Sequence, residues 1–263
     1  MTRRRLDVEL VRRHLARSRE QAQEYIAAGY VLVGGIVATK PATQVDEQAA
    51  IKVTVDAQDD YVSRGAHKLL GALDAFAVQV TGRIALDAGA STGGFSDVLL
   101  RRDIAHVYCV DVGYGQLAWK VSQDPRVTVL DRTNVRNLTP EVLGSTVDLI
   151  VADLSFISLE TVLPALASVL RPDGDALLMV KPQFEVGREH IGQGGVVESP
   201  ALRVAAVNKI ADRAWSLGLG TAGVVASPLP GPSGNVEYFL WLRRDAGQVD
   251  PQDIARAVEE GPA

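Results

Sequence analysis

A glycine-rich segment followed at a distance by an acidic residue is the first feature of this chain that could bind a ligand. The segment LDAGASTGGF (86–95) ends an apolar run with Asp87, and its glycines let the backbone turn tightly and approach a ligand beside a helix N-terminus. Asp111 follows Asp87 by 24 residues, close to the spacing at which an acidic strand end binds the ribose hydroxyls of an adenosine-containing cofactor. The pattern predicts such a cofactor site, and a glycine turn with an incidental aspartate is the alternative.

Two lysines and two carboxylates are the second candidate for chemistry. Lys68 stands in SRGAHKL, Asp153 in VADLSF, Lys181 in VKPQFE and Glu237 in GNVEYF. Each one alone is most simply explained as half of a surface salt bridge. If the fold brings all four to one place, they can hold and move a proton.

From residue 64 onward the chain alternates between strand and helix patterns. Seven apolar runs predict strands at 83–87, 106–111, 127–131, 147–153, 175–181, 221–226 and 236–242. Segments between the first six are long enough for crossover helices, including 94–102, 115–122, 158–170 and 200–218. This alternation predicts an α/β fold with a parallel, doubly wound sheet, in which ligands bind beyond the carboxyl ends of the strands.

The last strand is expected to run in reverse. Only SPLPGPSGN (227–235) joins it to the sixth, and nine residues rich in proline and glycine cannot hold a crossover helix. Glu237, at the start of the reversed strand, then lies at the same edge as Asp153 and Lys181, which end strands four and five. Lys68 is predicted on a helix that leads into the sheet, so all four residues can converge.

The reversed strand also bears on the cofactor. The glycine segment is a poor G-x-G-x-x-G and contains no G-K-[ST], which excludes a P-loop nucleotidase. A nicotinamide dehydrogenase remains possible. S-adenosylmethionine fits better, because the Rossmann-like fold that carries it has a seventh, reversed strand.

The first sixty residues predict a separate, small α+β unit. One helix follows from the apolar stripe Leu6, Leu10, Val11 and Leu15. A second helix is expected from the N-cap Ser18 to Gly29, with a buried face made of Ala22, Ile26 and Ala27. Short strands are expected at 30–33, 35–39 and 51–55.

Charge is distributed unevenly along the chain. The net charge is −5, but residues 1–19 hold seven arginines against Asp7 and Glu9, a local balance of +5. Residues 65–263 hold 17 basic against 23 acidic residues, a balance of −6. A basic head on an acidic body predicts contact with a polyanion through the head, and a solvated helix face is the alternative.

Composition excludes several classes of protein. With 263 residues, 47% of them hydrophobic and 22% charged, the chain has enough apolar residues for an ordinary folded core. No apolar stretch reaches spanning length, and we expect no secretory signal, because no apolar segment follows the basic residues at 3–5. The single cysteine, Cys109, cannot form an internal disulfide, which fits a reducing cytoplasm.

These residues carry a resemblance to a known family. Lys68, Asp153, Lys181 and Glu237 reproduce the Lys-Asp-Lys-Glu tetrad of FtsJ-like RNA ribose 2′-O-methyltransferases. The strings YVSRGAHKL, LDAGASTGGF, DVGYGQL, VVADLSFISL, VKPQFE and PLPGPSGNVEYFLWL resemble the TlyA family of ribosomal-RNA methyltransferases, over about residues 3–243. The head resembles an S4-type RNA-binding domain. The resulting division is an S4-like domain at 1–58, a linker at 59–63, a methyltransferase domain at 64–245 and a polar C-terminal tail at 246–263.

The resemblance implies an enzyme that uses S-adenosylmethionine to methylate the ribose 2′-hydroxyl of cytidine in 16S and/or 23S rRNA, on ribosomal subunits. Lys181 is our candidate for the general base. Burial and the nearby ammonium group of Lys68 favour the neutral form of Lys181, whereas the two carboxylates favour its charged form. The expected cofactor contacts are Asp87, Gly89, Ser91, Thr92, Gly93, Phe95, Asp111, Asn134 and Asp153. The expected RNA contacts are Arg3, Arg4, Arg17, Arg19, Lys40, Arg64, Arg132, Arg136 and Arg188.

We expect a cytoplasmic monomer that does not act at a membrane. We also expect no metal, because the four histidines do not have the spacing of metal ligands. Two alternatives stay open. One is an RNA-binding ribosome-assembly factor with a vestigial cofactor pocket. The other is a haemolysin, a label that some relatives carry.

Overall fold

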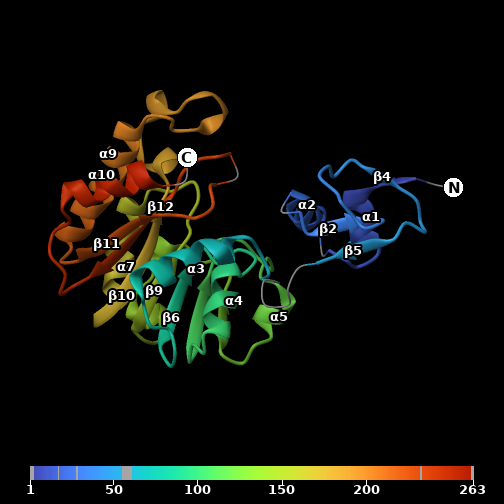
Figure 1. The fold of residues 1–263 in the computed structure, drawn as a ribbon. Coiled ribbons are helices and arrows are strands. Elements are labelled where there is room, and N and C mark those ends of the chain that lie inside the picture. The colour runs from blue at the N-terminus through green and yellow to red at the C-terminus, as the bar shows by residue number, and fades with distance from the viewer. Residues whose placement is uncertain (1–2, 17, 28, 55–60, 232, 262–263) are drawn as a thin grey trace. The chain divides into compact units, whose positions relative to one another are not determined.

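The computed structural model describes residues 3–16, 18–27, 29–54, 61–231 and 233–261, which form two compact units, 1–61 and 62–263. Figure 1 shows the elements of both units along the chain. The predicted linker at 59–63 falls only partly within the described residues. Val62 already belongs to the second unit, where its backbone N–H donates to Asp97 Oδ2 at 2.9 Å.

Unit 1 consists of two helices and two small antiparallel sheets. Its elements are β1 (Arg4–Arg5), α1 (Leu6–Arg12), α2 (Arg19–Ala27), β2 (Val31–Val33), β3 (Ile36–Val37), β4 (Gln44–Val45) and β5 (Ile51–Val53). The strand orders are β3-β2-β5 and β1-β4. Leu6, Leu10, Ala22, Ile26 and Val31 form the centre of its core.

The helices predicted in unit 1 are confirmed for α2 and only in part for α1. Ser18 Oγ accepts a hydrogen bond from the backbone N–H of Gln21 at 3.2 Å, and Gly29 has the positive φ (76°) of a helix stop. Two expectations were wrong: α1 ends at Arg12, before Leu15, and Ala27 is exposed. A last-turn alanine carries too little apolar area to force its own burial.

Unit 2 is built on one seven-stranded sheet. Its strands are β6 (Ile84–Ala88), β7 (His106–Val110), β8 (Val127–Leu130), β9 (Val147–Ala152), β10 (Leu170–Val180), β11 (Gly220–Ala226) and β12 (Tyr238–Arg243). Its helices are α3 (Gly65–Phe76), α4 (Gly94–Arg101), α5 (Trp119–Ser122), α6 (Pro140–Leu143), α7 (Leu159–Val169), α8 (Pro182–Glu185), α9 (Pro200–Ser216) and α10 (Pro251–Glu260).

The strand order is β11-β12-β10-β9-β6-β7-β8. The pairs among β6 to β10 are parallel, whereas β12 is antiparallel to both of its neighbours, β10 and β11. The predicted α/β fold with a reversed seventh strand is therefore confirmed. The segment expected as a helix at 115–122 is helical only over α5.

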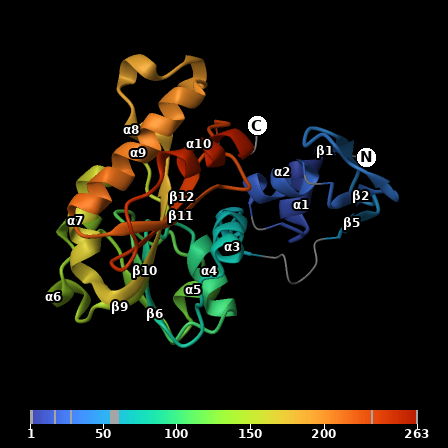
Figure 2. The same cartoon turned by 60° about the vertical axis from the view of Figure 1, so that its left-hand side comes forward.

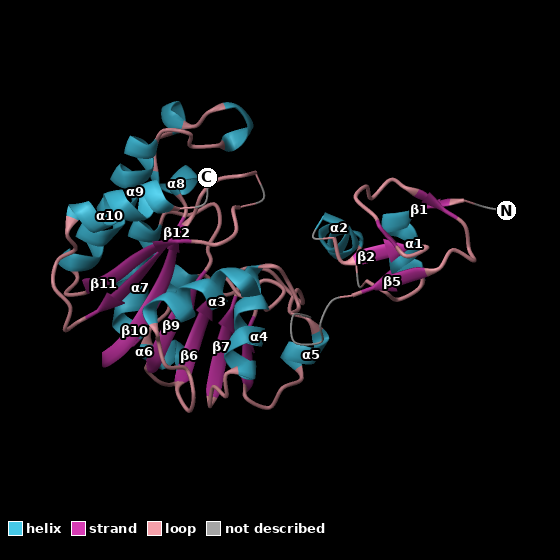
Figure 3. Ribbon diagram, in the orientation of Figure 1, coloured by secondary structure: helices cyan, strands magenta, loops and turns pink. Residues whose placement is uncertain are grey.

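Helices cover both faces of the sheet (Figures 2 and 3). Strand β12 shows the division, because its alternate side chains point to opposite faces. Phe239 and Trp241 contact Phe95 of α4 and Phe76 of α3, with ring centroids 6.1 and 5.5 Å apart. Leu240, between them, belongs to the core that packs against α7 and α9.

The polar C-terminal tail that we expected is wrong for most of its length. Residues 251–260 form α10, which Asp250 caps by accepting a hydrogen bond from Gln252 N at 2.8 Å. Ile254 and Val258 are buried in the core shared with α9. A stripe with i and i+4 spacing therefore anchors a segment whose overall composition is polar.

We predict that Ile254→Ala lowers the free energy of unfolding of unit 2 by about 2–5 kcal/mol, because it leaves a cavity at a site with 0% exposure. Urea unfolding followed by tryptophan fluorescence measures this, since Trp119, Trp215 and Trp241 all lie in unit 2. Arg256→Ala, on the exposed side of α10, is the control and should shift the value by less than about 0.5 kcal/mol. Equal small shifts for both variants would show that α10 does not stabilise the unit.

Candidate active site

The sheet reverses its strand order at β6, which pairs with β7 on one side and β9 on the other. The loops that follow β6 and β9 therefore lie side by side, where α/β sheets bind ligands. Asp153 N donates to Ala88 O at 3.2 Å across this junction. At Gly89, φ is 87° and a Cβ atom would lie 2.7 Å from Asp153 O, so only glycine fits.

A cavity of about 510 Å³ opens at this junction. Five of the nine predicted cofactor contacts line it: Gly89, Ser91, Asp111, Asn134 and Asp153. The remaining wall is mainly apolar and consists of Val110, Val112, Gln116, Val135, Leu154, Ser155, Phe156, Ile157 and Val162. Its volume and its apolar wall with few polar groups are typical of small-molecule sites.

Asp111 directs its carboxylate at two backbone donors of the cavity wall. Oδ2 accepts from Ser91 N at 2.9 Å, and Oδ1 accepts from Gly113 N at 2.7 Å. These bonds hold the carboxylate in place, and each oxygen keeps a lone pair for a further donor. Asn134 accepts from Arg136 N at 3.0 Å through Oδ1, which leaves its amide N–H groups free for a ligand within the described part of the chain.

The other four predicted cofactor contacts, Asp87, Thr92, Gly93 and Phe95, do not line the cavity. Asp87 is buried behind the loop and accepts from the N–H and hydroxyl of Ser96 at 3.0 and 2.7 Å. Burial raises the pKa of the Asp87 carboxyl to about 7, against the opposite effect of these bonds. Gly93 precedes α4, and Phe95 packs on β12. These residues shape the loop from behind.

The Lys-Asp-Lys-Glu tetrad consists of two ion pairs. Lys68 Nζ lies 2.5 Å from Glu237 Oε2, and Lys181 Nζ lies 2.5 Å from Asp153 Oδ1. The first pair is almost fully enclosed, with side-chain exposures of 5% and 0%. The second is more open, because Asp153 is 23% exposed and lines the cavity.

The sheet register brings the two pairs together. Val180 is paired with Tyr238 across β10 and β12, so Lys181 and Glu237 are the next opposing positions. Directly opposing residues project to the same face. Glu237 also shares its side of β12 with Trp241, which contacts α3, the helix that carries Lys68. All four predicted residues therefore lie at one edge of the sheet.

Sequence reasoning missed the residues just after Asp153. Ser155 Oγ accepts a hydrogen bond from Lys181 Nζ at 3.0 Å, and Phe156 is 92% exposed with φ of 63°. The Phe156 ring lies 5.3 Å from that of Phe184, which is 6.0 Å from Lys181 Nζ. The strand-end position that identified Asp153 is the signal that could have extended the prediction to this loop.

Side-chain hydrogen bonds hold the segment before β12 to two other parts of unit 2. Arg64, beside α3, donates to Pro230 O at 2.6 Å. Asn235 accepts from Val197 N at 2.9 Å and donates to Gly195 O at 2.8 Å. These bonds tie the segment to α3 and to the loop that precedes α9.

The arginines predicted to contact RNA differ in how they are held. In unit 2, Arg136 and Arg188 are exposed, and Arg132 lies over the Tyr114 ring at 4.3 Å. In unit 1, Arg3 and Lys40 are exposed. Arg4 pairs with Glu47 at 2.5 Å and Arg19 pairs with Asp7 at 3.0 Å, whereas Arg17 lies outside the described residues.

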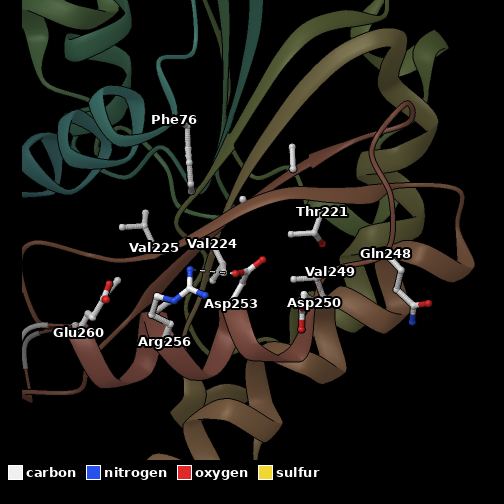
Figure 4. Close-up of a pocket in the computed structure, with 15 residues that line it drawn as sticks. Phe76, Thr221, Val224, Val225, Gln248, Val249, Asp250, Asp253, Arg256 and Glu260 are labelled. Carbon is white, nitrogen blue, oxygen red and sulfur yellow. Dashed lines mark ion pairs between the residues drawn. The ribbon is translucent and has the colours of Figure 1, made fainter.

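A second cavity, of about 590 Å³, lies between β11 and α10, away from the tetrad (Figure 4). Its charged residues are Asp250, Asp253, Glu260 and Arg256, of which Arg256 is paired with Asp253 at 3.3 Å. None of the tetrad residues and none of the predicted cofactor contacts line this second cavity. We therefore assign the chemistry to the cavity beside β6 and β9.

Comparisons with known proteins agree with this geometry. Residues 61–244 match the FtsJ-like methyltransferase family, and residues 4–51 match the S4 domain. The 16S/23S rRNA (cytidine-2'-O)-methyltransferase TlyA of Mycobacterium tuberculosis is 59% identical over 263 residues, which cover 98% of each chain. Hemolysin A of Brachyspira hyodysenteriae is 34% identical over 223 residues, 84% of this chain and 92% of that protein.

A solved structure from Streptococcus thermophilus, described as a candidate hemolysin, matches with a TM-score of 0.77 and 37% identity. The match covers 99% of this chain and 96% of that one. The sheet order, the tetrad at its edge and these matches lead to one assignment. The chain belongs to the FtsJ-like methyltransferases, within the TlyA family that carries an S4 domain before the methyltransferase domain.

Proposed function

We propose that this enzyme methylates the ribose 2′-hydroxyl of cytidine in 16S and/or 23S rRNA on ribosomal subunits, with S-adenosylmethionine as the methyl donor. One observation carries the proposal. Lys181 is bound by Asp153 and Ser155, and both of these residues line the cavity beside the glycine loop. A group able to hold a proton is thus placed next to a cofactor-sized cavity.

The cavity residues fit S-adenosylmethionine. Asp111 offers lone pairs to a ribose diol, and the apolar side chains of Val112, Val135 and Ile157 suit an adenine ring. Gly89 lets the backbone come close where a Cβ atom would collide, and Asp153 offers a carboxylate to the methionine amine. When bound, S-adenosylmethionine supplies a methyl group already activated by its positive sulfur.

Lys181 is our candidate for the group that takes the proton from the 2′-hydroxyl. The proton taken from the 2′-hydroxyl is held on Nζ, and Asp153 Oδ1, 2.5 Å away, stabilises the ammonium that forms. The hydrogen bond to Ser155 and the side chain of Phe184 restrict where the amine points. Alignment of the acceptor oxygen and removal of its proton are the two tasks that this edge can perform.

The Lys68–Glu237 pair supports Lys181 from behind. A buried ammonium without a partner is strongly disfavoured, and Glu237 supplies the partner for Lys68. Glu237 opposes Lys181 at the position next to the Val180–Tyr238 pair, and Lys68 reaches Glu237 from α3. We assign this pair to positioning and to charge balance.

An RNA substrate suits the rest of the chain. The S4 domain is an RNA-binding module, and the exposed Phe156 ring at the cavity mouth offers a surface on which an unpaired base can stack. We propose a monomer, because the tetrad and the cavity need no residue from a second copy. The proposal needs no metal, because the sulfur-bound methyl is already activated. Because ribosomal subunits are its proposed substrate, we propose that the enzyme acts in the cytoplasm.

The two alternatives differ from the proposal in what they require. An assembly factor with a vestigial pocket does not need the paired tetrad, yet all four of its residues are present and paired. A haemolysin has no need of the tetrad or of a cofactor-sized cavity, and this alternative rests only on the names of relatives. Among the described residues, the helices are too short or too polar to cross a membrane. We therefore retain the methyltransferase as the proposed function.

We predict that Lys181→Ala lowers methyl incorporation into purified ribosomal subunits by at least about 100-fold and leaves cofactor affinity within a few-fold, since loss of a general base costs about 10²–10⁴ in rate. Tritiated S-adenosylmethionine measures both quantities. Lys209→Ala is the control, because Lys209 is also paired, with Glu160 at 2.9 Å, but does not line the cavity. Retained turnover above about a hundredth of wild type would exclude Lys181 as the base.

We predict that Asp111→Ala weakens binding of S-adenosylmethionine far more than binding of RNA. The ribose loses charge-assisted hydrogen bonds worth about 1.5–3 kcal/mol each. Isothermal titration measures the cofactor affinity, with Asp124→Ala, an acidic residue paired with Arg126 before β8, as the control. Unchanged affinity in Asp111→Ala would contradict the ribose assignment.

We predict that a chain beginning at Asp60 still binds S-adenosylmethionine but loses most of its activity on subunits. The slope of the logarithm of RNA affinity against the logarithm of the salt concentration should become less steep by about 0.7–0.9 for each lost phosphate contact. The isolated head added in trans should not restore activity, because tethering supplies an effective concentration of order mM. Methyl incorporation across a salt series measures this. If the full-length and truncated chains show equal rates and equal salt slopes, the head does not bind the RNA and the arginines of unit 2 must do so.

A further inference from the structure

Unit 1 buries two carboxylates beneath an arginine-rich surface. Asp7 and Glu9 lie in the first turn of α1 and both have 0% exposure. A buried ion pair is a weak source of stability, because both groups must be removed from water. The two carboxylates differ in the side chains that they hold in place.

Asp7 binds two arginines and a glutamine from different parts of the unit. Arg5 donates from Nε to Oδ1 and from Nη2 to Oδ2, both at 3.0 Å. Arg19, at the start of α2, donates to Oδ2 at 3.0 Å, and Gln23 donates to the same oxygen at 3.1 Å. The Arg5 hydrogen bonds hold the pKa of the Asp7 carboxyl well below its usual range, so it stays ionised at neutral pH.

The two arginines keep most of their donors for an external partner. Their side chains are 43% and 57% exposed. Each guanidinium has five N–H donors, of which Asp7 takes two from Arg5 and one from Arg19. Neither side chain makes another hydrogen bond or ion pair within the described ranges. Two guanidinium groups are thus held next to each other with their free donors available.

Glu9 holds one exposed arginine, Arg12, and one inward-facing arginine, Arg13. It pairs with Arg12 at 2.6 Å and with Arg13 at 2.7 Å. Arg13 is only 21% exposed and donates to three backbone carbonyls between Asp46 and Ala49. Glu9 therefore orders an inward-facing arginine that ties α1 to a neighbouring turn.

We propose that Asp7 is a positioning residue for RNA binding, which holds Arg5 and Arg19 as a preformed site for phosphate groups of the substrate. This inference rests on the proposed function, since it needs an RNA that contacts unit 1. An arginine that is already held loses less side-chain freedom on binding, and its planar fork stays aligned for phosphate oxygens. The site adds Arg5 to the predicted RNA contacts.

The sign of one substitution separates this role from simple electrostatics. Asp7→Asn removes a negative charge from an RNA-binding surface, which strengthens binding if only net charge matters. If Asp7 positions the two arginines, the same change weakens binding. Glu20→Gln is the matched control, because Glu20 is exposed beside Arg19 and makes no ion pair within the described chain.

The experiment measures binding of full-length protein to purified, unmethylated ribosomal subunits across a salt series. We expect Asp7→Asn to weaken affinity about 10-fold, the scale expected when two arginine side chains regain their freedom, with an unchanged salt slope. Glu20→Gln should bind equally or more tightly. In an Arg5→Ala, Arg19→Ala background, Asp7→Asn should weaken binding no further, because the residues through which it acts are absent.

Each other outcome overturns a distinct statement. If Asp7→Asn binds subunits equally or more tightly, net charge alone explains the contribution of Asp7 to binding. If Asp7→Asn weakens binding by the same factor in the Arg5→Ala, Arg19→Ala background, Asp7 acts through folding of the unit. Either result refutes positioning. If Arg5→Ala, Arg19→Ala binds like wild type while the chain beginning at Asp60 does not, the positioning role of Asp7 is refuted. The proposal that the head binds RNA is then retained. If that truncated chain also binds like wild type, the role of the head in the proposed function fails.

Discussion

The burial of two lysine ammonium groups at one edge of the sheet is the constraint on which the active site depends. Lys68 and Lys181 are 5% and 9% exposed, and charges so enclosed persist only with partners. The partners come from two further elements, Asp153 after β9 and Glu237 before β12. The reversed β12 is essential, because only an antiparallel strand places the residue before its start, Glu237, opposite Lys181.

Unit 1 uses the opposite arrangement of charge. There Asp7 is buried and its two arginine partners, Arg5 and Arg19, are exposed, so Asp7 orders cations that face solvent. In unit 2 the lysines are buried, and Asp153, the most exposed member of the tetrad, faces the cavity. The first arrangement suits binding of a polyanion, which needs outward donors. The second suits proton transfer, which needs a group shielded from bulk water.

Strand patterns and turn lengths predicted the sheet and the convergence of the tetrad, because both follow from topology. The partners of the arginines could not be predicted, since Arg19 meets Asp7 only after α1 and α2 pack. The position of Phe95 outside the cavity wall could not be predicted, because a residue next to a glycine loop can face either the ligand or the core. The α10 helix was missed because Ile254 and Val258 stand within a polar sequence, and their burial depends on α9.

Asp153 joins the two halves of the site. Its side chain lines the cavity and binds Lys181, while its backbone contacts the glycine loop at Ala88 and Gly89. A ligand that fills the cavity displaces water from beside this carboxylate, and electrostatic interactions strengthen as water leaves. A ligand in the cavity therefore lies against the same carboxylate that binds Lys181. A single side chain connects the cavity to the residue that we propose as the general base.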